Sequence, residues 1–126
     1  GALCYHATAA LMTPFGEKVR ALRRQKSIPL KDMAADLNVS SAYLSALEHG
    51  HRGRPSAGFV LQVCGYLGVI WDDAEELKQL AELSHPRVTI DTAGLSPNAT
   101  LLANRLAQQI RSLDDQKILR LLEELQ

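Results

Sequence analysis

The side chains best suited to chemistry in this 126-residue sequence are the basic ones that cluster between residues 13 and 54. This segment has eight lysines and arginines against four acids, a net charge of +4, although the formal charge of the whole chain is 0. Cationic side chains neutralise phosphates, so such a cluster favours contact with a polyanion. Residues 55–84 carry one base against five acids, a net charge of −4. Charge is therefore sorted along the chain, and the basic segment is the candidate binding surface.

Other kinds of chemistry find little support in the sequence. Cys4 and Cys64 form no CxxC pair, so they build neither a disulfide framework nor a four-cysteine zinc site, and Cys64 is expected to pack as a small hydrophobic residue. No acid or cysteine stands at a supporting spacing from His49-Gly50-His51 to complete a metal site. No glycine-rich phosphate loop and no serine–histidine–aspartate arrangement is present. We therefore expect no enzyme activity, no metal and no cofactor.

Length and composition indicate a globular protein with one domain-sized core, since 46% of the residues are apolar and 22% are charged. No apolar run approaches the ~18 residues that a membrane span needs. We expect a cytoplasmic, nucleoid-associated protein with no membrane partner. Residues 1–11 contain no lysine, arginine, aspartate or glutamate, and we interpret them as a leader or an added sequence without regular structure.

Apolar residues at helical spacing predict five helices in residues 12–84. Hydroxyl side chains that can cap a helix N-terminus precede three of them, at Thr13, Ser40 and Ser56. Asn38 ends the second helix, because asparagine tolerates the left-handed conformation better than most residues. The five helices are expected over about 14–26, 30–37, 41–49, 57–67 and 72–83.

The end of this region has its own signals. Asp72 with Glu75 forms an acidic variant of the capping box and is expected to start the fifth helix. Trp71, just before it, is expected to fill the core. Residues 85–96 contain proline and glycine and are interpreted as a linker, with an alternating segment at 88–90 that suits one short strand.

Residues 97–126 predict a helical hairpin. Ser96 precedes one amphipathic helix and Asp114 the next, and each helix has an apolar stripe. More leucines are present than one seam between two helices can bury, so we expect the hairpin to dimerise or to dock a partner protein. The alternative is that the hairpin covers the fourth and fifth helices of its own chain. The leucines left over are Leu101, Leu119 and Leu121.

The segment 30–50 predicts a helix-turn-helix. Its two short helices are joined by only four residues, Leu37-Asn38-Val39-Ser40, so they must cross steeply and pack closely. The crossing needs a small side chain, which Ala34 supplies. It also needs buried aliphatic side chains on each helix, and Leu44 and Leu47 supply these on the second.

Taken together, residues 33–50, MAADLNVSSAYLSALEHG, resemble the Xre/Cro family of lambda-repressor-like DNA-binding domains, and the resemblance covers about residues 13–70. It implies an all-α, five-helix domain at 12–84 that binds double-stranded DNA with its third helix in the major groove, ahead of the hairpin at 97–126. We therefore expect a transcriptional regulator, and the leftover leucines of the hairpin favour a homodimer that binds a near-palindromic operator.

Carried over by position, the resemblance places base contacts in the third helix. Family members often have glutamine, arginine or lysine there, whereas this chain offers serine hydroxyls, a tyrosine ring and alanine methyl groups. We therefore expect DNA shape to carry a larger share of the specificity than usual. The base-contacting candidates are Ser41, Ala42, Tyr43, Ser45 and Ala46.

Phosphate contacts are expected from the basic side chains around this helix. The loop 51–55 leaves three interpretations open. Its two arginines clamp phosphates, or they enter a narrow A·T minor groove as in the AT-hook that the loop resembles, or the loop is simply solvated. The candidates for phosphate or minor-groove contact are Arg20, Arg24, Lys31, His49, His51, Arg52 and Arg54.

The resemblance gives Glu48 a structural role, because the residue at that position pairs with a base on the first helix, which here is Arg23. Two functions other than a sequence-specific regulator stay open. The hairpin could bind a partner protein in an antitoxin-like or adaptor role, or the arginine loop could serve an A·T-preferring architectural DNA binder.

Overall fold

The computed structural model describes residues 12–51 and 53–126, in which all regular structure is helical. The prediction of an all-α fold is therefore confirmed. The expectations for residues 1–11 and for Arg52 lie outside the described residues. The chain divides into two compact units, the first ending at Val88 and the second comprising Thr89–Gln126. Within the part of the chain that the structure describes, no helix combines the length and apolar character needed to cross a membrane.

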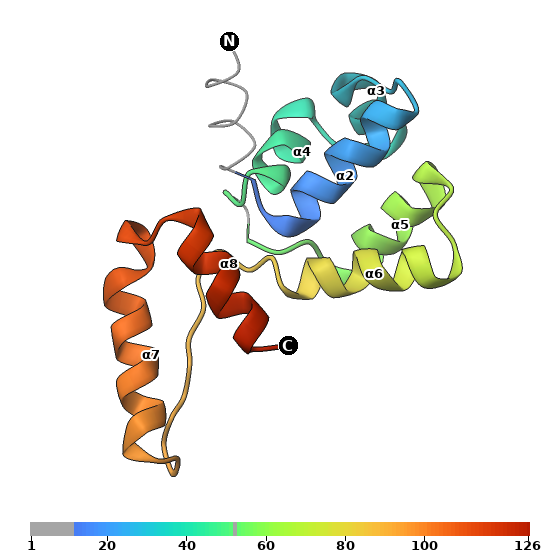
Figure 1. The fold of residues 1–126 in the computed structure, drawn as a ribbon. Coiled ribbons are helices and arrows are strands. Elements are labelled where there is room, and N and C mark those ends of the chain that lie inside the picture. The colour runs from blue at the N-terminus through green and yellow to red at the C-terminus, as the bar shows by residue number, and fades with distance from the viewer. Residues whose placement is uncertain (1–11, 52) are drawn as a thin grey trace. The chain divides into compact units, whose positions relative to one another are not determined.

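The described residues of the first unit form five helices around one core. In chain order they are α2 (Pro14–Gln25), α3 (Leu30–Asp36), α4 (Ser41–Glu48), α5 (Ala57–Leu67) and α6 (Trp71–Glu82). Helix α2 lies between the α3–α4 pair and the α5–α6 pair, packing against α4 on one side and α6 on the other (Figure 1). Cys64 is buried as expected, at 5% exposure. The largest fully buried side chains are Phe15, Met33, Leu44, Leu47, Leu67, Leu77, Val19 and Val63.

Short-range capping explains where three of these helices, α2, α4 and α5, begin. Thr13 Oγ1 accepts a hydrogen bond from the Gly16 amide, Ser40 Oγ from Tyr43 and Ser56 Oγ from Phe59. Each hydroxyl satisfies an amide that the first turn of a helix leaves unpaired. The three predicted caps are confirmed.

Three predictions beyond α5 are wrong. Helix α6 begins at Trp71 with Ile70 as its N-cap and no side-chain cap, so Asp72 lies in the first turn, where its charge favours the positive end of the helix. Trp71 is 83% exposed. It lies six residues before the buried Leu77, about 120° away around the helix. No strand forms at 88–90, since a strand needs a partner and the described residues contain none.

The second unit consists of α7 (Pro97–Gln109), a 3₁₀ turn η1 (Ile110–Ser112) and α8 (Asp115–Glu124). Ser96 Oγ and Asp114 Oδ1 cap the two α-helices by accepting from backbone amides. No residue of these three elements is buried, and Leu102 and Leu122 are 62% and 51% exposed. The two predicted helices therefore form, but their apolar stripes are only partly covered in this unit.

Candidate nucleic-acid interface

The turn between α3 and α4 has the geometry that a helix-turn-helix requires. Asn38 has φ 61°, the left-handed conformation expected for it. This bend lets the Val39 amide donate to the Ala34 carbonyl at 2.9 Å, which closes the end of α3. Ser40 then caps α4 immediately. Ala34 itself is 1% exposed, so a small side chain does occupy the close contact between these helices.

Helix α4 has a buried C-terminal half and an exposed N-terminal turn. Leu44, Leu47 and Glu48 are buried, whereas Ser41 and Ala42 are exposed. The buried residues fix the axis of the helix against the core. The two exposed residues are therefore presented on a rigid support, as direct contact with base edges would require.

The other three candidates for base contact are half-buried. The Tyr43 ring meets Phe59 of α5 edge to face, with centroids 6.0 Å apart and planes at 88°. The Ser45 carbonyl accepts from His49 Nδ1 at 2.8 Å, so that nitrogen carries the proton. Tyr43 thus belongs partly to the packing between helices, and the exposed fractions of Tyr43, Ser45 and Ala46 are smaller than those of Ser41 and Ala42.

The basic candidates differ in their surroundings. Arg24 at the end of α2 and Lys31 at the start of α3 are exposed, and Arg20 is half-buried with Nη1 3.7 Å from Met12 Sδ. The rings of His49 and His51 are stacked, with centroids 6.4 Å apart. In the described residues, no cluster of three or more histidine, cysteine, aspartate or glutamate side chains is suited to a metal ion.

Arg54 is engaged by the acidic segment. Its Nη1 lies 2.6 Å from Glu82 Oε2 at the end of α6, although the two residues are 28 positions apart in sequence. Both side chains are at least half exposed, so solvent screens this pair. The structure therefore brings Arg54 to the end of α6.

Glu48 and Arg23 form a buried pair beneath α4. Arg23 Nη2 lies 3.6 Å from Glu48 Oε1, and the two side chains are 12% and 3% exposed. Arg23 Nη1 also donates to the Ile28 carbonyl at 3.2 Å. Burial raises the pKa of the Glu48 carboxyl above its ordinary 4.5, and the nearby Arg23, Arg20 and His49 only partly oppose this effect. Arg23 Nε and Glu48 Oε2 have no hydrogen-bond partner among the described residues, so the pair is incompletely satisfied.

Two residues that hold the interface in place had no recognisable signal in the sequence. A Cβ on Gly16 would lie 2.1 Å from the Glu48 carbonyl oxygen, so α2 crosses the end of α4 at backbone contact. Ser84 is 3% exposed, and its Oγ accepts from the Phe15 amide at 2.9 Å while donating to the Leu80 carbonyl. The Gly16–Glu48 and Phe15–Ser84 contacts join residues far apart in sequence, which local pattern does not encode.

Comparison with known proteins agrees with this geometry. A family model described as a helix-turn-helix domain matches residues 14–80. The uncharacterized HTH-type transcriptional regulator RghRB of Bacillus subtilis (strain 168) is 32% identical over 62 residues, covering 49% of this chain and 45% of that protein. The HTH-type transcriptional repressor RghR of the same strain is 31% identical over 61 residues, covering 48% and 45%.

These matches therefore span about half of this chain and just under half of each curated relative. No solved structure matches the chain. The matched residues contain α2 to α5 and most of α6, including the turn at Asn38 and the capped start of α4. The chain belongs to the helix-turn-helix domain family.

Proposed function

We propose that this protein is a sequence-specific DNA-binding transcriptional regulator. The observation that carries the proposal is the exposed N-terminal turn of α4, supported by a buried C-terminal half. In the major groove, the Ser41 hydroxyl can donate or accept a hydrogen bond at a base edge, and the Ala42 methyl group can contact a thymine methyl.

The charge distribution supports DNA as the partner. Arg24 and Lys31 are exposed on the two helices that support α4, and His51 is exposed just after it. Contacts from such residues to phosphates position a protein on the duplex without specifying sequence. Glu82 places a negative charge beside Arg54, which opposes contact of this part of the loop with phosphates, so the base-reading function is favoured over the architectural alternative, in which the arginine loop carries binding.

The names of the two relatives describe transcriptional regulation, and one is called a repressor. Their similarity covers about half of this chain, and the helix-turn-helix family model covers residues 14–80. This agreement supports the regulator assignment for the first unit, while the role of residues 97–126 depends on the structure of that segment itself.

For residues 97–126 we propose homodimerisation. The support is the absence of any buried residue in α7, η1 and α8, which leaves apolar side chains such as Leu122 open to a second copy. A twofold-symmetric dimer would present its two α4 helices about 34 Å apart, matching half-sites roughly 10 base pairs apart. An adaptor that binds another protein through the same helices is the second candidate, because the same exposed leucines favour it.

The first experiment is selection of bound duplexes from a random library by the full chain, with a salt titration of the enriched sequence. The proposal expects a near-palindrome whose affinity falls with a log–log salt slope of several units. Enrichment of A·T-rich composition alone would contradict base reading, and a failure to retain any duplex would contradict DNA binding itself.

Substitution of α4 tests the contact directly. Ala42→Gln adds a side chain that can make a bidentate contact to adenine, so the enriched sequence should change at one position in each half-site, with discrimination of about 1–3 kcal/mol. Ala107→Gln, the same change at an exposed position of α7, is the matched control. An unchanged motif in the Ala42 variant would show that this turn does not contact bases.

Sedimentation of the full chain separates the dimer from the adaptor. A dimer at micromolar concentration supports the homodimer. A chain that is monomeric alone and forms a heavier complex only when a different protein is added would favour the adaptor instead.

A further inference from the structure

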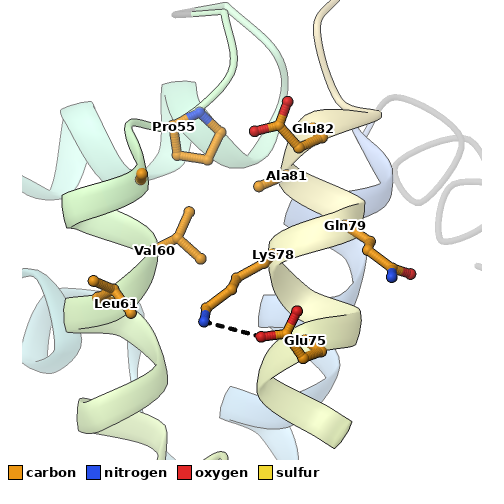
Figure 2. A pocket seen from close by; sticks show the side chains of 9 residues that line it. Pro55, Val60, Leu61, Glu75, Lys78, Gln79, Ala81 and Glu82 are labelled. Atoms are coloured by element: carbon orange, nitrogen blue, oxygen red, sulfur yellow. Dashed lines mark hydrogen bonds and ion pairs between the residues drawn. The ribbon is translucent and has the colours of Figure 1, made fainter.

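A pocket of about 440 Å³ lies between α5 and α6 in the first unit (Figure 2). Its volume falls within the roughly 300–1,000 Å³ typical of small-molecule sites. None of the five base-contacting candidates lines it. The pocket is therefore separate from the proposed DNA-contacting turn.

One wall of the pocket is apolar. Ala57, Val60 and Leu61 follow one another along α5 at helical spacing, and the buried Pro55 lies at one end (Figure 2). Leu61 is 57% exposed, so the chain itself does not cover this wall completely. A wall of this kind suits an aliphatic chain, whose transfer from water onto the exposed leucine is favourable.

The opposite wall supplies one cation. The Lys78 side chain extends from α6 across the pocket towards α5 (Figure 2), and its Nζ lies 3.1 Å from Glu75 Oε1. An ammonium group has three donors, and Glu75 is the one hydrogen-bond partner of Lys78 in the described residues. The Glu75 side chain is 64% exposed. Water can therefore replace Lys78 at the Glu75 carboxylate at little cost.

The lining acids do not offer an equivalent place to a positive ligand. Glu82 already accepts from Arg54 at 2.6 Å, and Glu75 accepts from Lys78. Each of these acids thus has a base beside it, and both stay on the α6 side of the pocket (Figure 2). Lys78 is the charged lining residue that reaches across towards the apolar wall of α5 (Figure 2), so a head group bound beside that wall meets the ammonium group, and the preferred head group is an anion.

We propose that the α5–α6 pocket binds an aliphatic monocarboxylate of medium chain length. The chain lies along Ala57, Val60 and Leu61, and the carboxylate accepts hydrogen bonds from Lys78 Nζ. Pro55 and Glu82 also line the pocket, and Glu82 holds Arg54. The ligand therefore lies against the loop that joins α4 to α5. The binding site does not depend on the proposed DNA function, and its test needs no DNA.

The test is methyl NMR of the full chain titrated with octanoate, with octylammonium and 1-octanol as matched probes. Octanoate should shift the Val60 and Leu61 methyl signals saturably and leave those of Val19, buried on α2, unchanged. Both head groups can accept a hydrogen bond from Lys78, but only the carboxylate adds attraction between opposite charges, so octanoate should bind at least about tenfold more tightly than 1-octanol.

Lys78→Met keeps most of the aliphatic stem and removes the charge. It should weaken octanoate binding about tenfold or more and weaken 1-octanol binding much less, because the hydroxyl carries no charge. Lys18→Met on α2 removes a similarly exposed lysine, paired with Glu76 at 3.9 Å, and should change neither affinity. The proposal is wrong if octanoate produces no saturable shift at Val60 and Leu61. It is also wrong if octylammonium binds as tightly as octanoate, or if Lys78→Met leaves octanoate affinity intact.

Discussion

The two units of this chain use the same local signals to begin their helices but differ in what covers those helices. In the first unit, Ser40 caps α4, and Leu44 and Leu47 then enter a shared core. In the second, Ser96 caps α7 in the same way, yet no residue of that helix is buried. Helices of 13 and 10 residues are marginal on their own in water. Capping therefore determines where a helix begins, whereas burial determines how stable it is.

The largest expected effect concerns the buried pair of the first unit. Arg23→Met leaves the Glu48 carboxylate buried without its partner and should lower the free energy of unfolding by about 3–5 kcal/mol. Arg24→Met, at the exposed neighbouring position, is the matched control and should change it by less than about 0.5 kcal/mol. Urea denaturation measures both. Equal effects would mean that the pair does not support the fold.

The next effect concerns the backbone contact between α2 and α4. Gly16→Ala places a methyl group against the Glu48 carbonyl and should destabilise the first unit by about 1–3 kcal/mol or more. Gly65→Ala on α5 meets open space and should stabilise by about 0.5–1 kcal/mol, because alanine loses less backbone entropy in a helix. Thermal unfolding of both variants tests the opposite signs. A stabilised Gly16 variant would refute the close approach.

A pair of cap substitutions compares the two units directly. Ser40→Ala should lower the free energy of unfolding of the first unit by about 1 kcal/mol, because the Tyr43 amide loses its acceptor. Ser96→Ala removes the equivalent acceptor for Ala99 in the second unit. It should reduce helical circular dichroism without moving the main unfolding transition. A shift of that transition by Ser96→Ala would show that the two units unfold together.

The buried Glu48 carboxyl predicts that the free energy of unfolding depends on pH. Burial raises the pKa of this carboxyl, whereas attraction to Arg23 lowers it. Because burial raises the pKa of Glu48 above 4.5, the folded state binds a proton more tightly than the unfolded chain does. The stabilisation of the folded state by this tighter proton binding is fully present below pH 4.5, and it is lost as the pH rises through the pKa of Glu48 in the folded state. The stability of the wild type relative to Glu48→Gln should therefore increase as the pH falls from 7 towards 4.5. A decrease over that window would mean that attraction to Arg23 outweighs burial.

The smallest effect on folding is expected in the second unit. Substituting both Leu121 and Leu122 with glutamine removes no buried contact within the unit, so the unfolding transition should move by less than about 0.5 kcal/mol. The same change should weaken self-association at least about tenfold if α8 lies in the dimer interface. The control substitutes Leu83 and Val88, each 74% exposed in the first unit, with glutamine. Sedimentation equilibrium distinguishes these outcomes.

The features that the sequence predicted correctly are those that depend on residues close together along the chain. The caps at Thr13, Ser40 and Ser56 and the left-handed turn at Asn38 each depend on a few adjacent positions. For this reason, local pattern alone locates the helix-turn-helix to within a residue or two. The exposure of Ser41 and Ala42 follows from the same periodicity, since Leu44 and Leu47 determine which face turns inward.

What the sequence did not predict depends on tertiary neighbours. Trp71 was expected in the core because of its size, but the inward face of α6 is occupied by Leu77 and Ala81. The Arg54–Glu82 pair and the Gly16 contact join distant segments, so no local pattern indicated them. Half-burial of Tyr43 likewise depends on Phe59, which belongs to another helix.

The hydrogen bonds of Ser84 also have a consequence for how this domain can be combined with others. By joining the Phe15 amide to the Leu80 carbonyl, Ser84 holds the start of α2 and the end of α6 within one side chain of each other. A helical core whose first and last described helices meet this closely can be inserted into a surface loop of another protein, or circularly permuted through a short linker, without rearrangement of the core.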